Sequence, residues 1–257
     1  MTLSRTSAVW ATLAVALALS AVHLFAPGIR RRLPLTSQAV TSFGGGVAAT
    51  YVFLYLLPRL AEGNQAVAAV LGDKVRSTPL AGLATSLVAL LGFVTFYALE
   101  RVTHRSQRGT AEPTRAVFLV QLAFFAAYSG LMTYTLATKW QAGALPALLF
   151  AVAMGLHIFA TDHVLAEHFP VRLTGRSRFV LAAGALTGWL VAVAVQPAGT
   201  PLINTLTAFL GGAILLNVFI DELPPERHSS FGWFVAGLVA YALLLIFATV
   251  AGKPGAA

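Results

Sequence analysis

Eight apolar runs of about 20 residues fill most of this chain and leave only short polar segments between them. The runs cover residues 7–27, 37–58, 79–100, 115–137, 143–166, 178–196, 202–221 and 231–251. A run of this length spans the hydrocarbon core of a bilayer as an α-helix. The sequence lacks the alternation of apolar and polar residues that marks a membrane barrel. It therefore predicts an all-α polytopic membrane protein, with residues 1–257 forming a single transmembrane domain.

The composition excludes several classes of function. Apolar residues make up 58% of the chain and charged residues only 10%, which is too little charge for the surface of a soluble domain. The chain has no cysteine, so it has no disulfide framework, thiolate metal site or redox dithiol. The net charge is +8, but the basic residues lie singly or in short groups between apolar runs. That pattern is typical of membrane topology, so we expect the lipid bilayer as a partner and no nucleic acid.

Arginine and lysine are distributed unevenly between the two sides of the predicted bundle. Eleven of the 17 basic residues follow the first, third, fifth and seventh runs, and six lie on the other side. The side richer in basic residues normally faces the cytoplasm. We therefore expect both termini outside, in an integral protein of a bacterial inner membrane.

Residues 43–60 and 209–227 look like two copies of one segment. Seven aligned positions are identical: Phe43/Phe209, Gly45/Gly211, Gly46/Gly212, Val52/Val218, Phe53/Phe219, Leu57/Leu223 and Pro58/Pro224. The predicted topology makes the copies run in opposite directions, as in the inverted repeats of secondary transporters. We expect a 3+2+3 layout, with repeat one at 1–100, central helices at 114–168 and repeat two at 176–251. The alternative is that glycine-rich faces recur in any bundle, because small residues let helices approach.

The fifth run concentrates ionisable residues, with His157, Asp162, His163, Glu167 and His168 in close succession. Imidazole and carboxylate are common ligands of divalent metals. His163 and Glu167 share a helix face. We expect Glu167 and His168 at the cytoplasmic surface as solvated charges. His157 and Asp162 lie deeper and should face the bundle interior, towards the second and seventh runs. The alternative for these two is a structural pair or a helix-end hydrogen bond.

The seventh run ends in a second polar group. Asn217 and Asp221 share a helix face, and Glu222 follows just before two prolines that break the helix. Tyr51 and Tyr55 hold the matching positions in the other copy. Polar groups thus recur at one depth in both halves, although helix-end polarity would also explain Asp221 and Glu222. The candidate metal ligands are His157, Asp162, His163, Glu167, Asn217, Asp221 and Glu222.

Three other positions in the apolar runs receive a structural interpretation. We expect His23, near the end of the first run, to be an interfacial residue rather than a ligand. Gly184 and Gly188 lie one turn apart in the sixth run and should allow close helix packing.

These motifs resemble the ZIP family of metal transporters. Phe43-x-Gly45-Gly46 through Leu56-Leu57-Pro58 looks like the second helix of that family. Glu222-Leu-Pro-Pro-Glu226 looks like the Glu-Leu-Leu-Pro-Glu that closes its seventh helix, and His157 fits the first histidine of its His-Glu-x-x-Glu type of motif. The resemblance covers most of the chain. It implies an eight-helix 3+2+3 bundle and transport of a divalent cation such as zinc.

The chain also departs from the family pattern. The fourth helix of the family carries His-Asn-x-x-Glu-Gly, whereas residues 125–130 read Phe-Ala-Ala-Tyr-Ser-Gly and keep only the glycine. In the fifth run the carboxylate positions fall on Ile158 and Thr161. A dehydrated divalent ion needs several oxygen or nitrogen ligands, some of them anionic. We therefore expect no paired-metal site, and at most a single weaker one such as a zinc site.

Three functions remain open from the sequence. The first is a ZIP-like transporter of altered or weakened metal selectivity. The second is a ZIP-like protein that transports nothing and acts as a subunit, sensor or scaffold, in a homodimer or a membrane complex. The third is an intramembrane metal hydrolase, which needs three well-spaced ligands. Because only His157 and Asp162 lie deep enough, we expect a protein that is not an enzyme.

Overall fold

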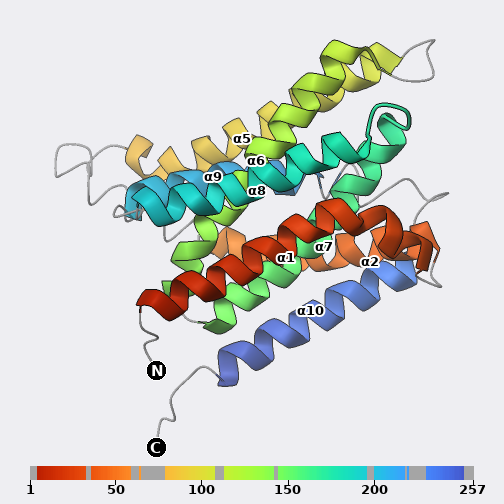
Figure 1. Cartoon of the computed structure of the whole chain (residues 1–257). Coiled ribbons are helices and arrows are strands. Elements are labelled where there is room, and N and C mark those ends of the chain that lie inside the picture. The colour runs from red at the N-terminus through yellow and green to blue at the C-terminus, as the bar shows by residue number, and fades with distance from the viewer. Residues whose placement is uncertain are drawn as a thin grey trace, which may run out of the picture.

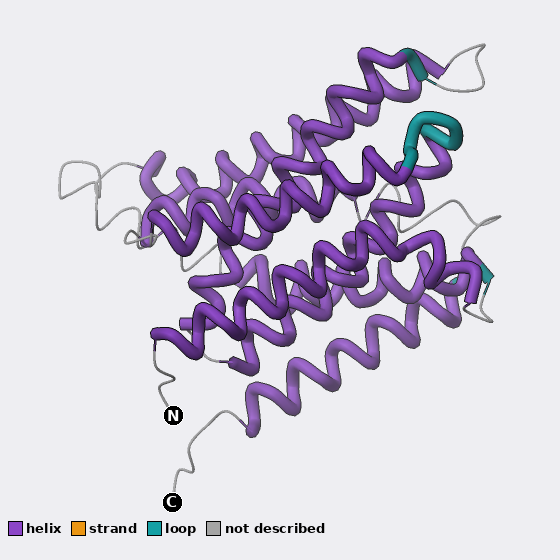
Figure 2. The backbone as a smooth tube through the Cα atoms, viewed as in Figure 1, coloured by secondary structure: helices purple, strands orange, loops and turns teal. Residues whose placement is uncertain are grey.

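The computed structural model describes residues 5–32, 36–58, 64, 79–107, 113–141, 144–195, 200–217, 219 and 230–251. All regular structure in these ranges is helical. The α-helices are α1 (Arg5–Arg32), α2 (Ser37–Thr50), α5 (Pro79–Gln107), α6 (Arg115–Gln141), α7 (Ala144–His168), α8 (Gly175–Val195), α9 (Thr200–Asn217) and α10 (Phe231–Ala251). A π-helical segment, η1 (Tyr51–Leu56), continues α2. The prediction of an all-α protein is confirmed (Figure 2).

Six of the described helices are long and apolar enough to cross a membrane, and shorter apolar stretches lie in α9 (Leu202–Asn217) and α10 (Phe231–Phe247). Many large apolar side chains face outward from the bundle, for example Phe247, which is 72% exposed. An apolar outer surface requires lipid around it. The chain is therefore a helical integral membrane protein.

Helices α5 and α1 extend furthest beyond the predicted apolar runs. Helix α5 continues to Gln107, so much of the basic segment expected to be a loop at 101–114 is helical. Its residues are compatible with a helix, and neither proline nor glycine interrupts them before 107. Helix α1 likewise continues past Pro27 to Arg32. Hydropathy marks the part of a helix that lipid covers, whereas the helix itself ends where the backbone is broken.

The helices pack in pairs around a central helix. Helix α2 lies against α10, α5 against α9, and α6 against α8. Figure 1 shows the α2–α10 pair and the α5–α9 pair towards opposite sides of the bundle, with α1 and α7 between them. Helix α7 contacts α1, α2, α6 and α10. The residues that concentrate ionisable groups in the sequence are thus on a helix that packs against four others.

One type of close contact occurs in both outer pairs. In α2–α10, a Cβ added at Gly46 would collide with the Phe234 carbonyl, and one at Gly237 with the Phe43 carbonyl. In α5–α9, a Cβ at Gly212 would collide with the Ala89 carbonyl, and one at Gly92 with the Phe209 carbonyl. Gly46 and Gly212 are equivalent in the sequence alignment, as are Phe43 and Phe209. Aligned positions therefore make the same backbone contact in two separate helix pairs.

The close packing expected at Gly184 and Gly188 is confirmed. A Cβ at Gly184 would meet the backbone of Ala126, and one at Gly188 would meet the backbone of Gly130. Helices α6 and α8 can approach this closely only because all side chains at the contact are small.

We predict that Gly212→Val destabilises the protein by at least about 2 kcal/mol, because the added side chain must push apart two helix backbones. The measurement is thermal unfolding in detergent, followed by size-exclusion chromatography. Gly28→Ala is the matched control, since no atom lies within 4 Å of its Cβ position. It should be neutral or stabilising by up to about 1 kcal/mol. Equal unfolding temperatures for the two variants would contradict the packing described here.

Candidate functional site

Helix α7 carries its two deepest ionisable residues on different faces. The side chains of His157 and Asp162 are buried, with 1% and 2% of their surface exposed. Five helical residues separate them, which places them about 140° apart around the axis. They therefore contact different neighbours, and the structure does not bring them together as ligands of one ion.

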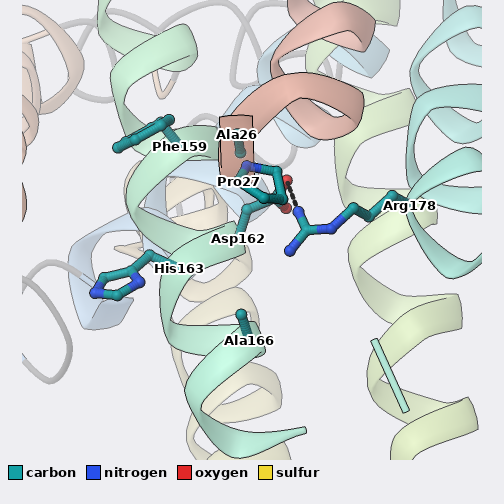
Figure 3. Close-up of a pocket in the computed structure, with 7 residues that line it drawn as sticks. All are labelled: Ala26, Pro27, Phe159, Asp162, His163, Ala166 and Arg178. Carbon is teal, nitrogen blue, oxygen red and sulfur yellow. Dashed lines mark ion pairs between the residues drawn. The ribbon is translucent and has the colours of Figure 1, made fainter. Parts of the chain in front are cut away.

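The Asp162 carboxylate lies between two basic groups from other helices. His23 Nδ1 on α1 lies 3.0 Å from one carboxylate oxygen and 3.1 Å from the other. Arg178 on α8 lies 3.5 Å from Asp162 (Figure 3) and donates a 3.4 Å hydrogen bond to the His23 carbonyl. The expected direction of Asp162, towards the second and seventh runs, is wrong, because these partners come from α1 and α8.

His23 and Arg178 belong to this buried network, and the sequence interpretation missed both. His23 was expected at the interface, but it is only 3% exposed. Its Nε2 lies 3.0 Å from the Ser129 hydroxyl on α6. Arg178 counted as one of the basic residues on the cytoplasmic side, yet its guanidinium reaches into the bundle. The available signal for His23 was an imidazole inside an apolar run, where an ionisable group needs a partner.

Ser129, His23 and Asp162 form a continuous hydrogen-bonded chain. Serine hydrolases use the same order of groups, in which histidine takes a proton from serine while aspartate orients the ring. Here Ser129 is 2% exposed, and the cavity beside Asp162 is not lined by it. The arrangement therefore suits holding α1, α6 and α7 together better than attack on a substrate.

A cavity of about 420 Å³ adjoins this network. Its lining residues are Ala26, Pro27, Phe159, Asp162, His163, Ala166 and Arg178 (Figure 3). In Figure 3 the His163 imidazole points away from the Asp162–Arg178 pair. It pairs instead with Glu167 at 3.2 Å, and the Glu167 side chain is 63% exposed. The predicted shared face of His163 and Glu167 and the surface position of Glu167 are confirmed.

The other face of α7 carries a second polar group, and the described contacts within it are between uncharged partners. His157 Nε2 lies 3.1 Å from the Tyr128 hydroxyl on α6. The Asn217 amide on α9 donates a 3.1 Å hydrogen bond to the Thr161 hydroxyl on α7. Asn217 is 1% exposed, and its Oδ1 accepts no hydrogen bond from the described atoms. This α7 face, which we call the His157 face, thus meets polar groups from α6 and α9.

The remaining predicted ligands are outside this arrangement. Asp221 and Glu222 lie outside the described residues.

In α6, Phe125 is buried and packs edge-on against Phe96 at a ring distance of 5.8 Å. Within the described ranges, the group of three His, Asp or Glu side chains with ligand atoms within 4.8 Å of one another is Glu100, His104 and His168. The sequence interpretation missed Glu100 and His104, although their i, i+4 spacing was visible.

Neither a model of a known protein family nor a curated protein matches this chain. What is shown is therefore the class, a helical integral membrane protein with polar groups buried on two faces of one helix. The likeness to the ZIP family rests on the residues of the chain itself.

We predict that Asp162→Ala destabilises the protein by about 3 kcal/mol, because it leaves the largely buried Arg178 guanidinium without its counter-charge and the buried His23 ring without a hydrogen-bond partner. Glu167→Ala is the control, since it removes a solvent-exposed charge of the same helix and should change stability by less than about 1 kcal/mol. Thermal unfolding of both purified variants in detergent measures the difference. A silent Asp162→Ala would show that the network does not hold the helices.

Proposed function

We propose that this protein is a ZIP-like transporter of a divalent metal cation, with weakened selectivity, and that the cation passes along the His157 face of α7. The observation that supports this most is the buried polar group formed by Tyr128, His157, Thr161 and Asn217 at the meeting of α6, α7 and α9. Burying uncompensated polar atoms inside a membrane bundle costs free energy, and such groups commonly mark substrate pathways. The Asn217 Oδ1 atom is free to accept a cation there.

The ligand chemistry of this group supports weak binding. Imidazole, phenol, hydroxyl and amide are all neutral donors, and the described side chains that contact one another here carry no carboxylate. A divalent cation that sheds its water needs anionic ligands to compensate for the lost hydration. The site is therefore a place of passage for a single ion, unlike the metal pair implied by the family resemblance.

The transport mechanism that goes with this site is an inverted 3+2+3 repeat. Its support is the pair of glycine contacts that aligned positions make in α2–α10 and in α5–α9. Helices α1, α2 and α5 form one repeat, α8, α9 and α10 the other, and α6 and α7 lie between them. Two such repeats can alternate between outward-open and inward-open arrangements around a central site.

A second function has an observation of its own. The α6 positions where the family carries metal ligands have structural contacts here. Phe125 packs on Phe96, and Ser129 bonds to His23 of the Asp162 network. These contacts favour a non-transporting subunit, sensor or scaffold with the same bundle. A homodimer or another membrane protein would then be its partner.

Metal uptake into proteoliposomes separates the two functions. We predict uptake of at least one of zinc, manganese, iron(II) and cobalt by the purified protein, and at least a ten-fold loss of rate in His157→Ala. The reason is that this change removes the strongest ligand of the buried polar face. Asn217→Ala should also lower the rate, because it removes the free amide oxygen.

The control for this assay is Glu167→Gln, an exposed residue of α7 that should transport at the parent rate. Folded parent protein that moves none of the four ions would support the scaffold function instead. Uptake that His157→Ala leaves unchanged would place the path elsewhere.

We further propose an orientation with both termini outside, in a bacterial inner membrane, because of the excess of arginine on one side. The natural absence of cysteine allows single-cysteine labelling without background. Cysteines placed at Arg105 and Gly175 should be protected from an impermeant thiol reagent added outside intact cells. Labelling of both positions from outside would reverse the orientation.

A further inference from the structure

Helices α5 and α7 bring three metal-binding side chains together at their C-terminal ends. Glu100 and His104 lie one turn apart on α5, and His168 is the last residue of α7. Their ligand atoms all lie within 4.8 Å of one another. The His104 and His168 rings meet edge to face, with centroids 5.4 Å apart. None of the three takes part in the Asp162 network or in the His157–Tyr128 contact.

The carboxylate of this group has an oxygen atom that accepts no hydrogen bond from the described residues. Glu100 is only 3% exposed, and its Oε2 accepts no hydrogen bond from the described atoms. That atom lies 3.7 Å from His104 Nε2, which is too long for a hydrogen bond. A buried, unpaired carboxylate oxygen costs free energy, and a bound cation would compensate for it. His104 is largely exposed, so an ion from solution can reach the group.

The charges around the group favour a cation. His168 has Glu100, His104 and Glu167 as electrostatic neighbours, two of them carboxylates. The C-terminal end of α7, where His168 lies, adds partial negative charge from the helix dipole. Arg101 and Arg105 also lie on this stretch of α5 and are exposed to solvent, where screening weakens their repulsion.

We propose that Glu100, His104 and His168 form a binding site for one borderline divalent transition-metal ion such as zinc. Two imidazoles and a carboxylate are a ligand set that zinc takes with a water in the fourth position. Neighbouring ligand atoms in a tetrahedral site lie about 3.4 Å apart. The Glu100 and His104 atoms, 3.7 Å apart, are therefore nearly in place, and a His168 nitrogen lies within 4.8 Å of both. The ion joins the end of α5 to the end of α7.

The site does not depend on the transport proposal, because it is occupied whether or not an ion crosses the membrane. It binds through groups from the ends of two helices, whereas the proposed path runs along the His157 face deeper in α7. A metal that bridges α5 and α7 restricts their relative movement. The ion therefore serves as a clamp between these two helices.

Zinc titration of the purified full-length protein, stripped of metal with a chelator, tests the site. We expect one zinc ion per chain by calorimetry, and a weakening of at least ten-fold in each of Glu100→Gln, His104→Ala and His168→Ala. Cobalt should give the visible absorption of a four- or five-coordinate ion in the parent and lose it in all three variants. His104→Ala changes a side chain that is 60% exposed, so it tests the ligand without threatening the fold.

Two matched histidine variants complete the test. His163→Ala and His157→Ala should keep the zinc affinity of the parent, since neither residue belongs to this group. Zinc should raise the unfolding temperature of the parent and of these two controls, but not of the three site variants. Parent-like zinc binding in both His104→Ala and His168→Ala would overturn the site. A His157→Ala variant that loses uptake yet keeps zinc would separate this site from the transport path.

Discussion

The buried carboxylate of Asp162 determines how the inner helices sit against one another. A lone carboxylate in a membrane bundle is strongly unfavourable, so its position is tolerated only with counter-groups close by. Those groups come from two other helices, His23 on α1 and Arg178 on α8. Because His23 also bonds to Ser129 on α6, one carboxylate links four helices. None of them can slide without exposing a charge or breaking a hydrogen bond.

The outer helices are held by a different force. Lipid gives little hydrophobic advantage to helix association, so close van der Waals contact must supply it. The glycines of α2–α10 and of α5–α9 allow that contact by removing the side chain at the crossing point. The bundle thus combines the charged Asp162 network at its centre with small-residue contacts at both sides. The Asp162 network sets how the inner helices are placed along one another, whereas the glycine contacts set the distance between the paired outer helices.

Different faces of helix α7 carry different groups of polar side chains. On its Asp162 face, both carboxylate oxygens contact groups from α1 or α8, which favours a structural role for this residue. On its His157 face the described contacts are to uncharged polar groups, and Asn217 Oδ1 accepts no hydrogen bond from the described atoms. At its end, His168 meets Glu100 and His104 of α5. A single helix thereby carries the Asp162 network, a proposed ion path and a proposed metal clamp. Successive residues project about 100° apart around the helix axis, so residues a few positions apart face different neighbours.

The sequence by itself determined the class of protein, the apolar helices, the small-residue contacts at Gly184 and Gly188, and the deep burial of His157 and Asp162. These follow from local rules, since apolar length and the cost of exposing a charge to lipid need no knowledge of neighbours. Only the tertiary structure decided which groups meet. Asp162 contacts His23, which is far away in the chain. Glu100 and His104 meet His168 because α5 continues as a helix beyond the apolar run predicted at 79–100. Partner choice depends on how helices pack across the bundle, and that packing is set by many weak contacts that no single segment encodes.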